Sequence, residues 1–444
     1  MKKTLTEESI LFISVLKWIF LAIIIGFIVG ILSGIFLKTL HLAVSFTTGF
    51  KYYFLLLPFC LFISRLLIKY ISPDATGTNR IIEILHLDEK ISYKIIPAIF
   101  FSSIITISGG GSAGKEAPCA DMGAVAGSIL GKILRLDKND IKKLVICGIS
   151  AGFASVFGTP VAGAIFGVEV LYVGSILYEV LLPSFIAGII SFNVTSSMGL
   201  NYFYYQIDVS TKFSSLSFLE TAGAGIFFGL ISVLFIEINK KIKKINNNFK
   251  IYEPLKSFLA GIVLIILTFI LSDKFLGLGI DTIISTLKGE GIVWYAFLAK
   301  MLFTAITLSF CGGGVITPIL FIGATAGSFF ADIFNLDRTL FAAMGVVSLL
   351  SGATNTPIAS SIMAVELFGS KIATYSTIAV LLSFIITGHR SILPAQILLV
   401  QKSKSINVEI GEKIGSVKTE IDIFTIRPIL RGIAKIKKII RRFF

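Results

Sequence analysis

The sequence contains few charged residues, histidines and cysteines, on which the surfaces of soluble proteins and the active sites of many enzymes depend. Only 15% of its 444 residues are charged, against 55% that are hydrophobic, and it contains three histidines and four cysteines. A soluble chain of this length could not hide so much apolar surface, so the shortage of charge excludes the soluble classes. The cysteines are scattered through apolar segments without metal-ligand spacing, and we expect neither a metal site nor a cofactor.

Apolar runs recur along the whole chain, at residues 11–36, 222–238, 258–271 and 378–388. Several are shorter than the roughly 20 residues that a simple membrane span needs. Many are also interrupted by glycine or proline, which favours tilted, half-length or re-entrant helices over a ladder of full spans. The first run follows Met1-Lys2-Lys3 without a small-residue cleavage site, so it does not have the form of a cleaved signal. We predict an all-α multi-pass membrane protein.

The formal net charge is +14, and the positive residues gather in short connectors and at the end of the chain. The cluster from Lys240 to Lys250 and the segment 391–444 fit cytoplasmic segments that obey the positive-inside rule, so no nucleic-acid partner is expected. Residues 1–11 are predicted to be cytoplasmic as well. The last part of the 391–444 tail fits either a surface helix on the inner leaflet or a disordered basic tail.

The chain contains an internal repeat with a nearly constant offset. Gly26-x-x-x-Gly30 returns 199 residues later, and residues 123–128 return as 323–328. Further matches at an offset of 197 join Gly148, Thr159-Pro160 and Glu169 to Gly345, Thr356-Pro357 and Glu366. Several matches in the same order predict two related membrane halves, 12–214 and 215–390. Such repeats place substrate sites at mid-membrane in many transporters, although most of the glycines could serve helix packing.

The segment from Gly109 to Pro118 contains the strongest candidate for a functional site. Its glycines break the preceding helix, and Pro118 suits the first turn of the next one. A helix that begins inside the membrane presents unpaired N–H groups and the positive end of its dipole, which together bind anions. Glu116 stands at this point, so its carboxylate should compete with a dissolved anion and leave when protonated. The alternative is an ordinary capping acid paired with Lys115.

Two motifs of soluble enzymes nearly match the same segment. Residues 109–115 imitate a phosphate-binding loop, but Glu116 stands where Ser or Thr would hold magnesium. The sequence around Ser112 imitates a nucleophile elbow, but no αβ pattern surrounds it and none of the three histidines is an obvious base. We therefore expect no enzyme; an intramembrane hydrolase using Ser112 is the alternative from another class.

These motifs resemble those of the CLC family of chloride channels and chloride/proton antiporters. Gly114-Lys115-Glu116-Ala117-Pro118 is similar to the family's Gly-(Lys/Arg)-Glu-Gly-Pro, and residues 314–318 are similar to its Gly-x-Phe-x-Pro. Residues 152–169 resemble the helix that follows the first motif. The resemblance implies two inverted halves in one membrane domain, a homodimer in the cell membrane with one anion pathway in each subunit, and partners that are chloride, protons and lipids.

The resemblance also implies roles for individual residues. Glu116 matches the gating glutamate, which accepts the proton. Thr76 matches a serine whose hydroxyl coordinates chloride, with Thr78 left as an alternative, and Tyr375 is the candidate for the family's central tyrosine. Ile316 stands where a backbone N–H faces the anion. The full anion-binding set expected from the sequence is Thr76, Gly114, Lys115, Glu116, Val315, Ile316, Thr317 and Tyr375.

Two departures bear on mechanism. Val170 stands where the family's antiporters usually carry a second proton glutamate, as in many of its channels, so channel and antiporter both stay open; Glu169 or water could substitute. The stretch 354–369 and Ile316-Thr317-Pro318 are also similar to the fluoride-exporting branch, which usually has Thr where this chain has Pro118. We expect chloride as the ion, with a fluoride/proton antiporter as the alternative. The short tail cannot hold the nucleotide-binding modules of many relatives.

Overall fold

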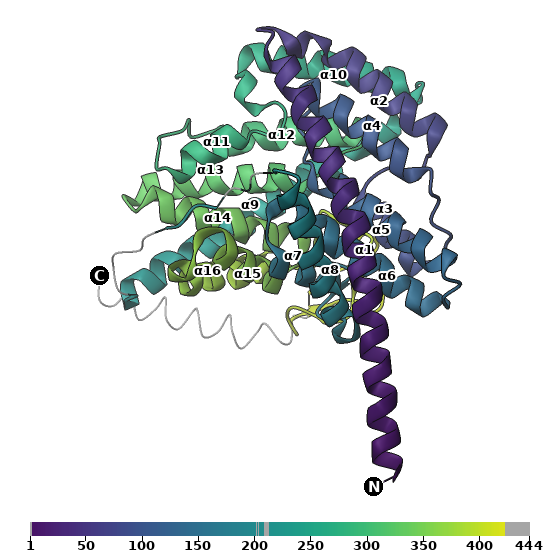
Figure 1. Ribbon diagram of the computed structural model, residues 1–444. Coiled ribbons are helices and arrows are strands. Elements are labelled where there is room, and N and C mark those ends of the chain that lie inside the picture. Colours follow the sequence, from purple (N-terminus) through teal and green to yellow (C-terminus); the bar gives the residue numbers. More distant parts are fainter. Residues whose placement is uncertain (1, 201, 203, 208–212, 422–444) are drawn as a thin grey trace.

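The computed structural model describes residues 2–200, 202, 204–207 and 213–421, and most of them are helical (Figure 1). The first part of the chain forms α1 (Lys2–Thr48), α2 (Leu57–Ile71), α3 (Thr78–His86), α4 (Ile95–Ser108), α5 (Glu116–Ile133), α6 (Lys138–Phe157), α7 (Pro160–Glu169) and α8 (Tyr178–Ser197). The second part forms α9 (Ser215–Asn248), α10 (Glu253–Ile270), α11 (Ile280–Leu287), α12 (Ala296–Phe310), α13 (Ile316–Phe334), α14 (Arg338–Thr354), α15 (Pro357–Phe368) and α16 (Ala373–Thr387). Three single 3₁₀ turns, Tyr53–Leu56, Asp273–Phe275 and Ser370–Ile372, link some of these helices.

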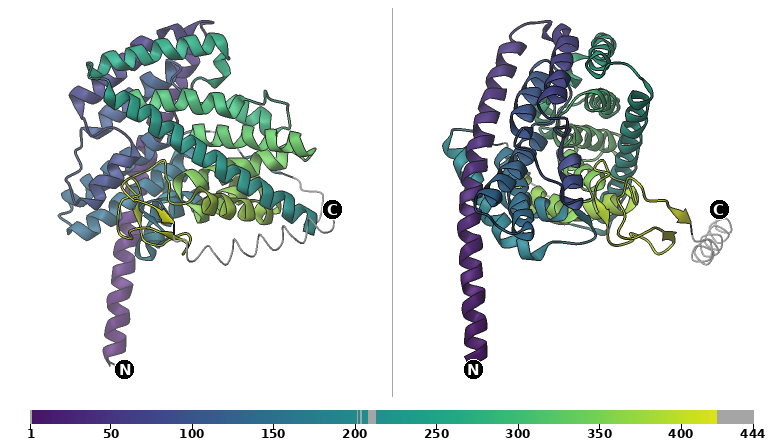
Figure 2. Two further views of the ribbon diagram at one scale, coloured as in Figure 1. Left: turned by 180° about the vertical axis from the view of Figure 1, so that it is seen from behind. Right: turned by 90° about the vertical axis from the view of Figure 1, so that its right-hand side faces the viewer.

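Helix length confirms the mixture of full and partial spans. Seven helices in the described part of the chain are long and apolar enough to cross a membrane, whereas α7 and α15 have only 10 and 12 residues. Each of these two short helices begins with a proline, which lacks the N–H that a first turn leaves unpaired. The long helix α1 runs the height of the molecule, and its first turns extend beyond the other helices (Figure 2).

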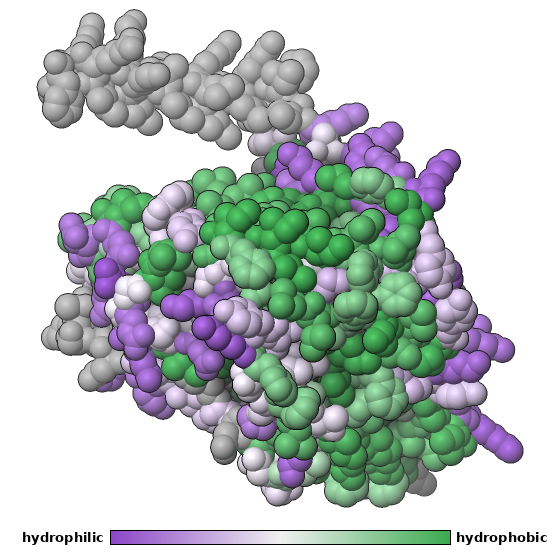
Figure 3. Space-filling model, turned by 90° about the horizontal axis from the view of Figure 1, so that it is seen from above, coloured by the Kyte–Doolittle hydropathy of each residue, from purple (hydrophilic) through white to green (hydrophobic). Residues whose placement is uncertain are grey.

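One face of the molecule is broadly apolar, with hydrophilic residues along its edges (Figure 3). The helices α2 and α10 expose many large apolar side chains, among them Phe59, Ile63, Leu259, Ile266 and Phe269. An apolar surface of this extent would be unfavourable in water and is what lipid-facing helices present.

The same close helix pairings occur in both parts of the chain. Gly123 of α5 faces the backbone of Gly148 on α6 so closely that a Cβ atom would not fit, and Gly323 of α13 faces Gly345 of α14 in the same way. Aspartates at corresponding positions cap the second helix of each pair: Asp137 accepts the N–H of Asp140, and Asp337 that of Leu340. The glycine matches in the sequence therefore correspond to equivalent backbone contacts.

Residues beyond α16 fold back onto the helices. The strands β1 (Tyr172–Val173) and β2 (Ile397–Leu398) pair in parallel, and β3 (Ile406–Asn407) pairs antiparallel with β4 (Glu420–Ile421). The side chain of Gln396 donates to the carbonyls of Val170 and Thr354, which joins the segment to both parts of the chain. The surface helix expected near the end of the tail lies outside the described residues.

Candidate functional site

Two glycine loops meet where α5 and α13 begin. The N–H of Gly114 donates to the carbonyl of Gly314 at 2.6 Å, and the N–H of Gly314 donates back at 3.1 Å. The two loops run antiparallel, as a two-fold relation between the parts of the chain requires. A side chain at Gly314 would collide with the Gly114 carbonyl, so this approach of two backbones depends on glycine.

Glu116 lies between the N-termini of these two helices and is completely buried. Its carboxylate accepts the N–H of Thr317 at 3.2 Å and the Thr317 hydroxyl in a short hydrogen bond. It also interacts with the N–H groups of Lys115 and of its own residue. The sequence predicted a carboxylate at the start of its own helix; the fold adds the N-terminus of α13. Glu116 therefore occupies the position in which both helices would hold an anion.

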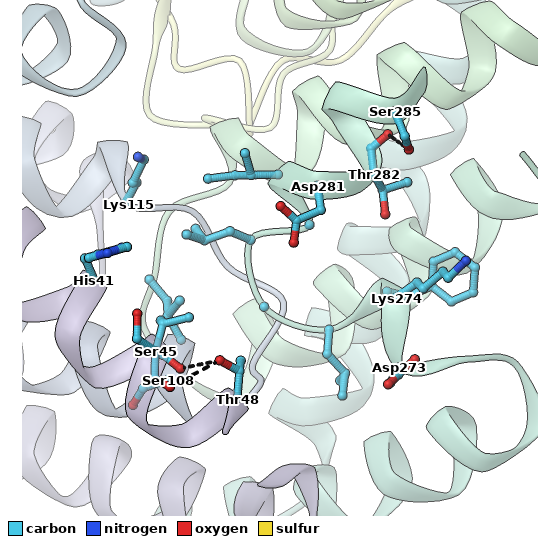
Figure 4. Close-up of a pocket in the computed structure, with 18 of the residues that line it drawn as sticks. His41, Ser45, Thr48, Ser108, Lys115, Asp273, Lys274, Asp281, Thr282 and Ser285 are labelled. Carbon is cyan, nitrogen blue, oxygen red and sulfur yellow. Dashed lines mark hydrogen bonds between the residues drawn. The ribbon is translucent and has the colours of Figure 1, made fainter. Parts of the chain in front are cut away.

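The residues on either side of Glu116 in the chain line two different cavities. The larger, about 1230 Å³, includes Lys115 in its wall and is called the Lys115 cavity. Figure 4 shows Lys115 and His41 on one side of it, with Asp281 and Lys274 on the other. The smaller, about 250 Å³, includes Ala117 and is called the Thr76 cavity; its wall also contains Thr76, Thr78, Val315, Ile316, Ser391 and Leu393. Glu116 itself lines neither cavity; it lies in the chain between Lys115, which lines the first, and Ala117, which lines the second.

The structure brings together most of the site expected from the sequence. Gly114, Lys115, Glu116 and residues 315–317 surround the loop pair, and the exposed Thr76 joins them through the wall of its cavity. Tyr375 is the exception. It is buried on α16, where its ring packs edge-on against Phe213 at 5.0 Å, and it lines neither cavity. The segment 391–394 lines the Thr76 cavity in the part of the chain that follows α16.

A family model described as voltage gated chloride channel matches residues 60–388. The chain belongs to the CLC family. It is 34% identical over 390 residues to the chloride/fluoride channel protein of Pseudomonas syringae pv. tomato, covering 86% of both chains. It is 25% identical over 417 residues to the H(+)/Cl(-) exchange transporter ClcA of Vibrio cholerae, again with 86% of both covered.

Solved CLC structures have the same fold. A CLC-type fluoride/proton antiporter matches with a TM-score of 0.83 and 27% identity over 86% of this chain and 98% of its own. A slow cyanobacterial Cl⁻/H⁺ antiporter matches with a TM-score of 0.74 and 18% identity over 83% and 94%, which supports the fold alone. This CLC protein is therefore a multi-pass membrane protein of a family that transports anions and protons.

Two further carboxylates in this CLC chain cap each other's helices, which sequence reasoning missed. Glu169 at the end of α7 accepts the N–H groups of Ile358 and Ala359 at 3.0 and 2.9 Å. Glu366 on α15 accepts those of Val161 and Ala162 at 3.0 and 2.8 Å. The equal offset of the two glutamates was the signal available in the sequence. Each oxygen of the Glu169 carboxylate thus accepts one backbone N–H at the start of α15.

Ser112 and two of the histidines, which a hydrolase would use as nucleophile and base, form other contacts in this structure. The Ser112 hydroxyl pairs with the Thr304 hydroxyl at 2.8 Å, and the Ser112 N–H donates to Thr307. His86 interacts with the Leu171 carbonyl and His389 accepts the N–H of Lys402, so neither serves Ser112 as a base. A hydrolase site at Ser112 has no support in these contacts.

Proposed function

We propose that this protein exchanges fluoride for protons across the cell membrane, with Glu116 as gate and proton acceptor in each subunit of a homodimer. The supporting observation is the position of the Glu116 carboxylate, which accepts the N–H and hydroxyl of Thr317 while its chain neighbours Lys115 and Ala117 line one cavity each. We infer that Glu116 closes the route between the two cavities. An anion and this carboxylate compete for the same donors. Protonation removes the charge of Glu116, so the carboxyl group no longer competes with an anion for these N–H and O–H donors. Anion binding and proton binding are therefore linked.

Fluoride rather than chloride is favoured by two observations. The hydroxyl of Thr317 adds a strong O–H donor to the backbone N–H at a compact site, and a small, strongly hydrated anion depends most on such donors. The relative at 34% identity is a chloride/fluoride channel protein, and the fluoride/proton antiporter structure matches at 27% identity. Chloride, the ion expected from the sequence, is the second candidate, because the exposed Thr76 lines its cavity as the family's chloride-binding serine would.

The sidedness of the two cavities follows from charge. Lys240 and Lys243, at the basic end of α9, line the Thr76 cavity together with residues 391–394. Lysine-rich segments lie on the cytoplasmic side of membrane proteins. We therefore infer that the Thr76 cavity opens towards the cytoplasm, the side on which both ends of the chain are expected, and that the Lys115 cavity opens outward.

Purified protein in liposomes tests the proposal when fluoride, chloride and proton fluxes are recorded together. We expect an outward fluoride gradient to drive uphill proton movement, and fluoride flux to exceed chloride flux severalfold. Chloride-driven proton movement with little fluoride flux would favour the second candidate. Anion flux that never moves protons against their gradient would make the protein a channel and overturn the exchange.

A further inference from the structure

A third buried carboxylate lies on α5 beyond the gate. Asp121 is 1% exposed, and its Oδ1 atom has no hydrogen-bond partner among the described residues. Its carboxyl group interacts with the hydroxyl of Thr78 on α3. An ionisable side chain in such a place is costly and is usually retained for a function. None of the roles assigned above uses Asp121.

Among the described residues, the charged groups on the helices packed around α5 have partners other than Asp121 or are exposed, as are Glu7, Glu8, Lys38, His41 and Lys138. On α3, Arg80 pairs with Asp74, Glu83 and Glu89, Glu83 pairs with Lys413, and His86 interacts with the Leu171 carbonyl. On α1 and α6, Lys17 pairs with Asp140, Lys142 with Asp88 and Lys143 with Glu179, while Lys38 is exposed. On α13, Asp332 pairs with Arg338, and α4 has no titratable side chain. The titratable groups near Asp121 on its own helix are Cys119 and Glu116.

Thr78 connects Asp121 to the anion pathway. It is the first residue of α3, it is 9% exposed, and it lines the Thr76 cavity with Ala117, Val315 and Ile316. A threonine hydroxyl has one proton to donate and can accept at the same time. The proton of Thr78 can therefore point to Asp121 or to an anion in the cavity, but not to both.

We propose that the protonation state of Asp121 decides whether Thr78 donates to an anion in the Thr76 cavity. When Asp121 is ionised, the Thr78 hydroxyl donates to its carboxylate. When Asp121 takes up one proton from the cavity water, its own O–H donates to the Thr78 oxygen, and the Thr78 proton turns to the anion. This step adds one proton to Asp121 and reverses the direction of the hydrogen bond between Asp121 and Thr78. The anion gains one hydrogen bond from Thr78. Asp121 is thus a positioning residue that acts through Thr78, and this step rests on the proposed function.

Binding then favours a proton and an anion together at a place separate from Glu116. By linkage, an anion in the Thr76 cavity raises the proton affinity of Asp121 by the same factor by which the proton raises anion affinity. The loss of one hydrogen bond to a charged partner corresponds to roughly a ten-fold change in affinity or more.

The test measures fluoride and chloride binding by calorimetry over a series of pH values in Glu116→Gln protein, in which the gate cannot titrate. We expect affinity to fall by about ten-fold or more as the pH rises. Adding Asp121→Asn should remove this pH dependence, because the amide cannot ionise. Adding Thr78→Val should keep affinity low at every pH, whereas adding Thr78→Ser should reproduce the profile of the Glu116→Gln parent.

Ser128→Ala is the matched control, because it changes another buried, unpartnered polar group on the same helix and should leave the profile unchanged. A pH-independent affinity in the Glu116→Gln parent, or an unchanged profile after Asp121→Asn, would overturn the proposal. Thermal unfolding of each variant identifies those that do not fold, and the Thr78 pair then decides. Failure of the proposed function would instead appear as absent anion and proton flux in the wild-type liposomes.

Discussion

At the scale of single residues, the proposed gate depends on the fact that a carboxylate and a dissolved anion accept hydrogen bonds from the same donors. Glu116 has no solvent exposure and satisfies its oxygens with N–H and O–H donors from two helix N-termini. Thr317 supplies two of these donors from the other loop. Because the N–H donors are fixed in the backbone, they would stay in place if the carboxylate moved away, and under the proposed function an anion would then bind to them.

Glu116→Gln should allow anion flux to persist while proton coupling is lost. The amide keeps the shape of the protonated acid but cannot ionise, so it neither competes as an anion nor transfers a proton. Simultaneous anion and proton recording in liposomes measures both. Glu253→Gln, at an exposed carboxylate on α10, is the matched control and should change neither flux. Full proton-coupled transport by Glu116→Gln would contradict the gating role.

At the scale of elements, two short helices are stabilised by each other. The helices α7 and α15 are too short to cross the membrane, so their first N–H groups lie where water is scarce. Glu169 and Glu366 each supply a carboxylate to the start of the opposite helix. The charge also interacts favourably with the positive end of the helix dipole.

Glu169→Ala should destabilise the protein by about 1–3 kcal/mol for each N–H that it leaves buried and unpaired. Glu366→Ala is the comparison variant. Its effect should be smaller, because Glu366 is half-buried whereas Glu169 is 5% exposed, and water can replace part of the lost contact. Thermal unfolding in detergent measures the difference. Equal stability of the Glu169→Ala variant and the wild type would show that the cap is dispensable.

Gly123→Ala should also destabilise the protein, because the added methyl group meets the backbone of Gly148 on α6. Forcing extra volume into such a contact costs about 1–3 kcal/mol. Gly223→Ala on α9 is the matched control: its Cβ would meet only the end of Phe330, at 3.8 Å. That variant should be neutral or slightly stabilised, since alanine favours helix over glycine by up to about 1 kcal/mol. A neutral Gly123→Ala variant would show that α5 and α6 can separate.

At the scale of the whole molecule, the segment after α16 joins parts of the chain that are distant in sequence. Gln396 bridges Val170 and Thr354, and Lys413 pairs with Glu83 on α3 at 2.8 Å. The hydrogen bond from Lys413 is the main cause that holds the pKa of Glu83 below its usual value, against the effect of partial burial. Because α3 begins at Thr78, this pair fastens the tail beside the Thr76 cavity.

Lys413→Met should loosen residues 391–421 without unfolding the helices. The folded pKa of Glu83 is lowered, so its contribution to stability is present above the unfolded pKa and is lost as the pH falls through the folded pKa. The protection factors of the tail amides, which correct for the slower intrinsic exchange in acid, should therefore fall at low pH in the wild type and already near neutral pH in the variant. A partly exposed pair is worth about 1 kcal/mol at most, so the expected change is small. Lys142→Met, which breaks an exposed pair with Asp88, is the control and should leave the tail unchanged.

The sequence by itself determined the membrane class, and it predicted the repeat and the two glycine loops that precede Glu116 and Ile316. Each of these depends on local properties: apolar run length, glycine and proline positions, and a carboxylate where a helix begins. Glu116 could be proposed from the residues because it stands where a helix begins, whereas residues 314–317 were proposed from their resemblance to a family motif.

Only the tertiary structure decided which distant side chains meet. It brought Glu116 to the N-terminus of α13, paired Glu169 and Glu366 with opposite helices, and placed Asp121 behind Thr78. It also packed the ring of Tyr375 on α16 against Phe213, outside the walls of the two cavities. A side chain's partners across helices depend on how the helices rotate and pack, and no spacing within a single segment specifies this.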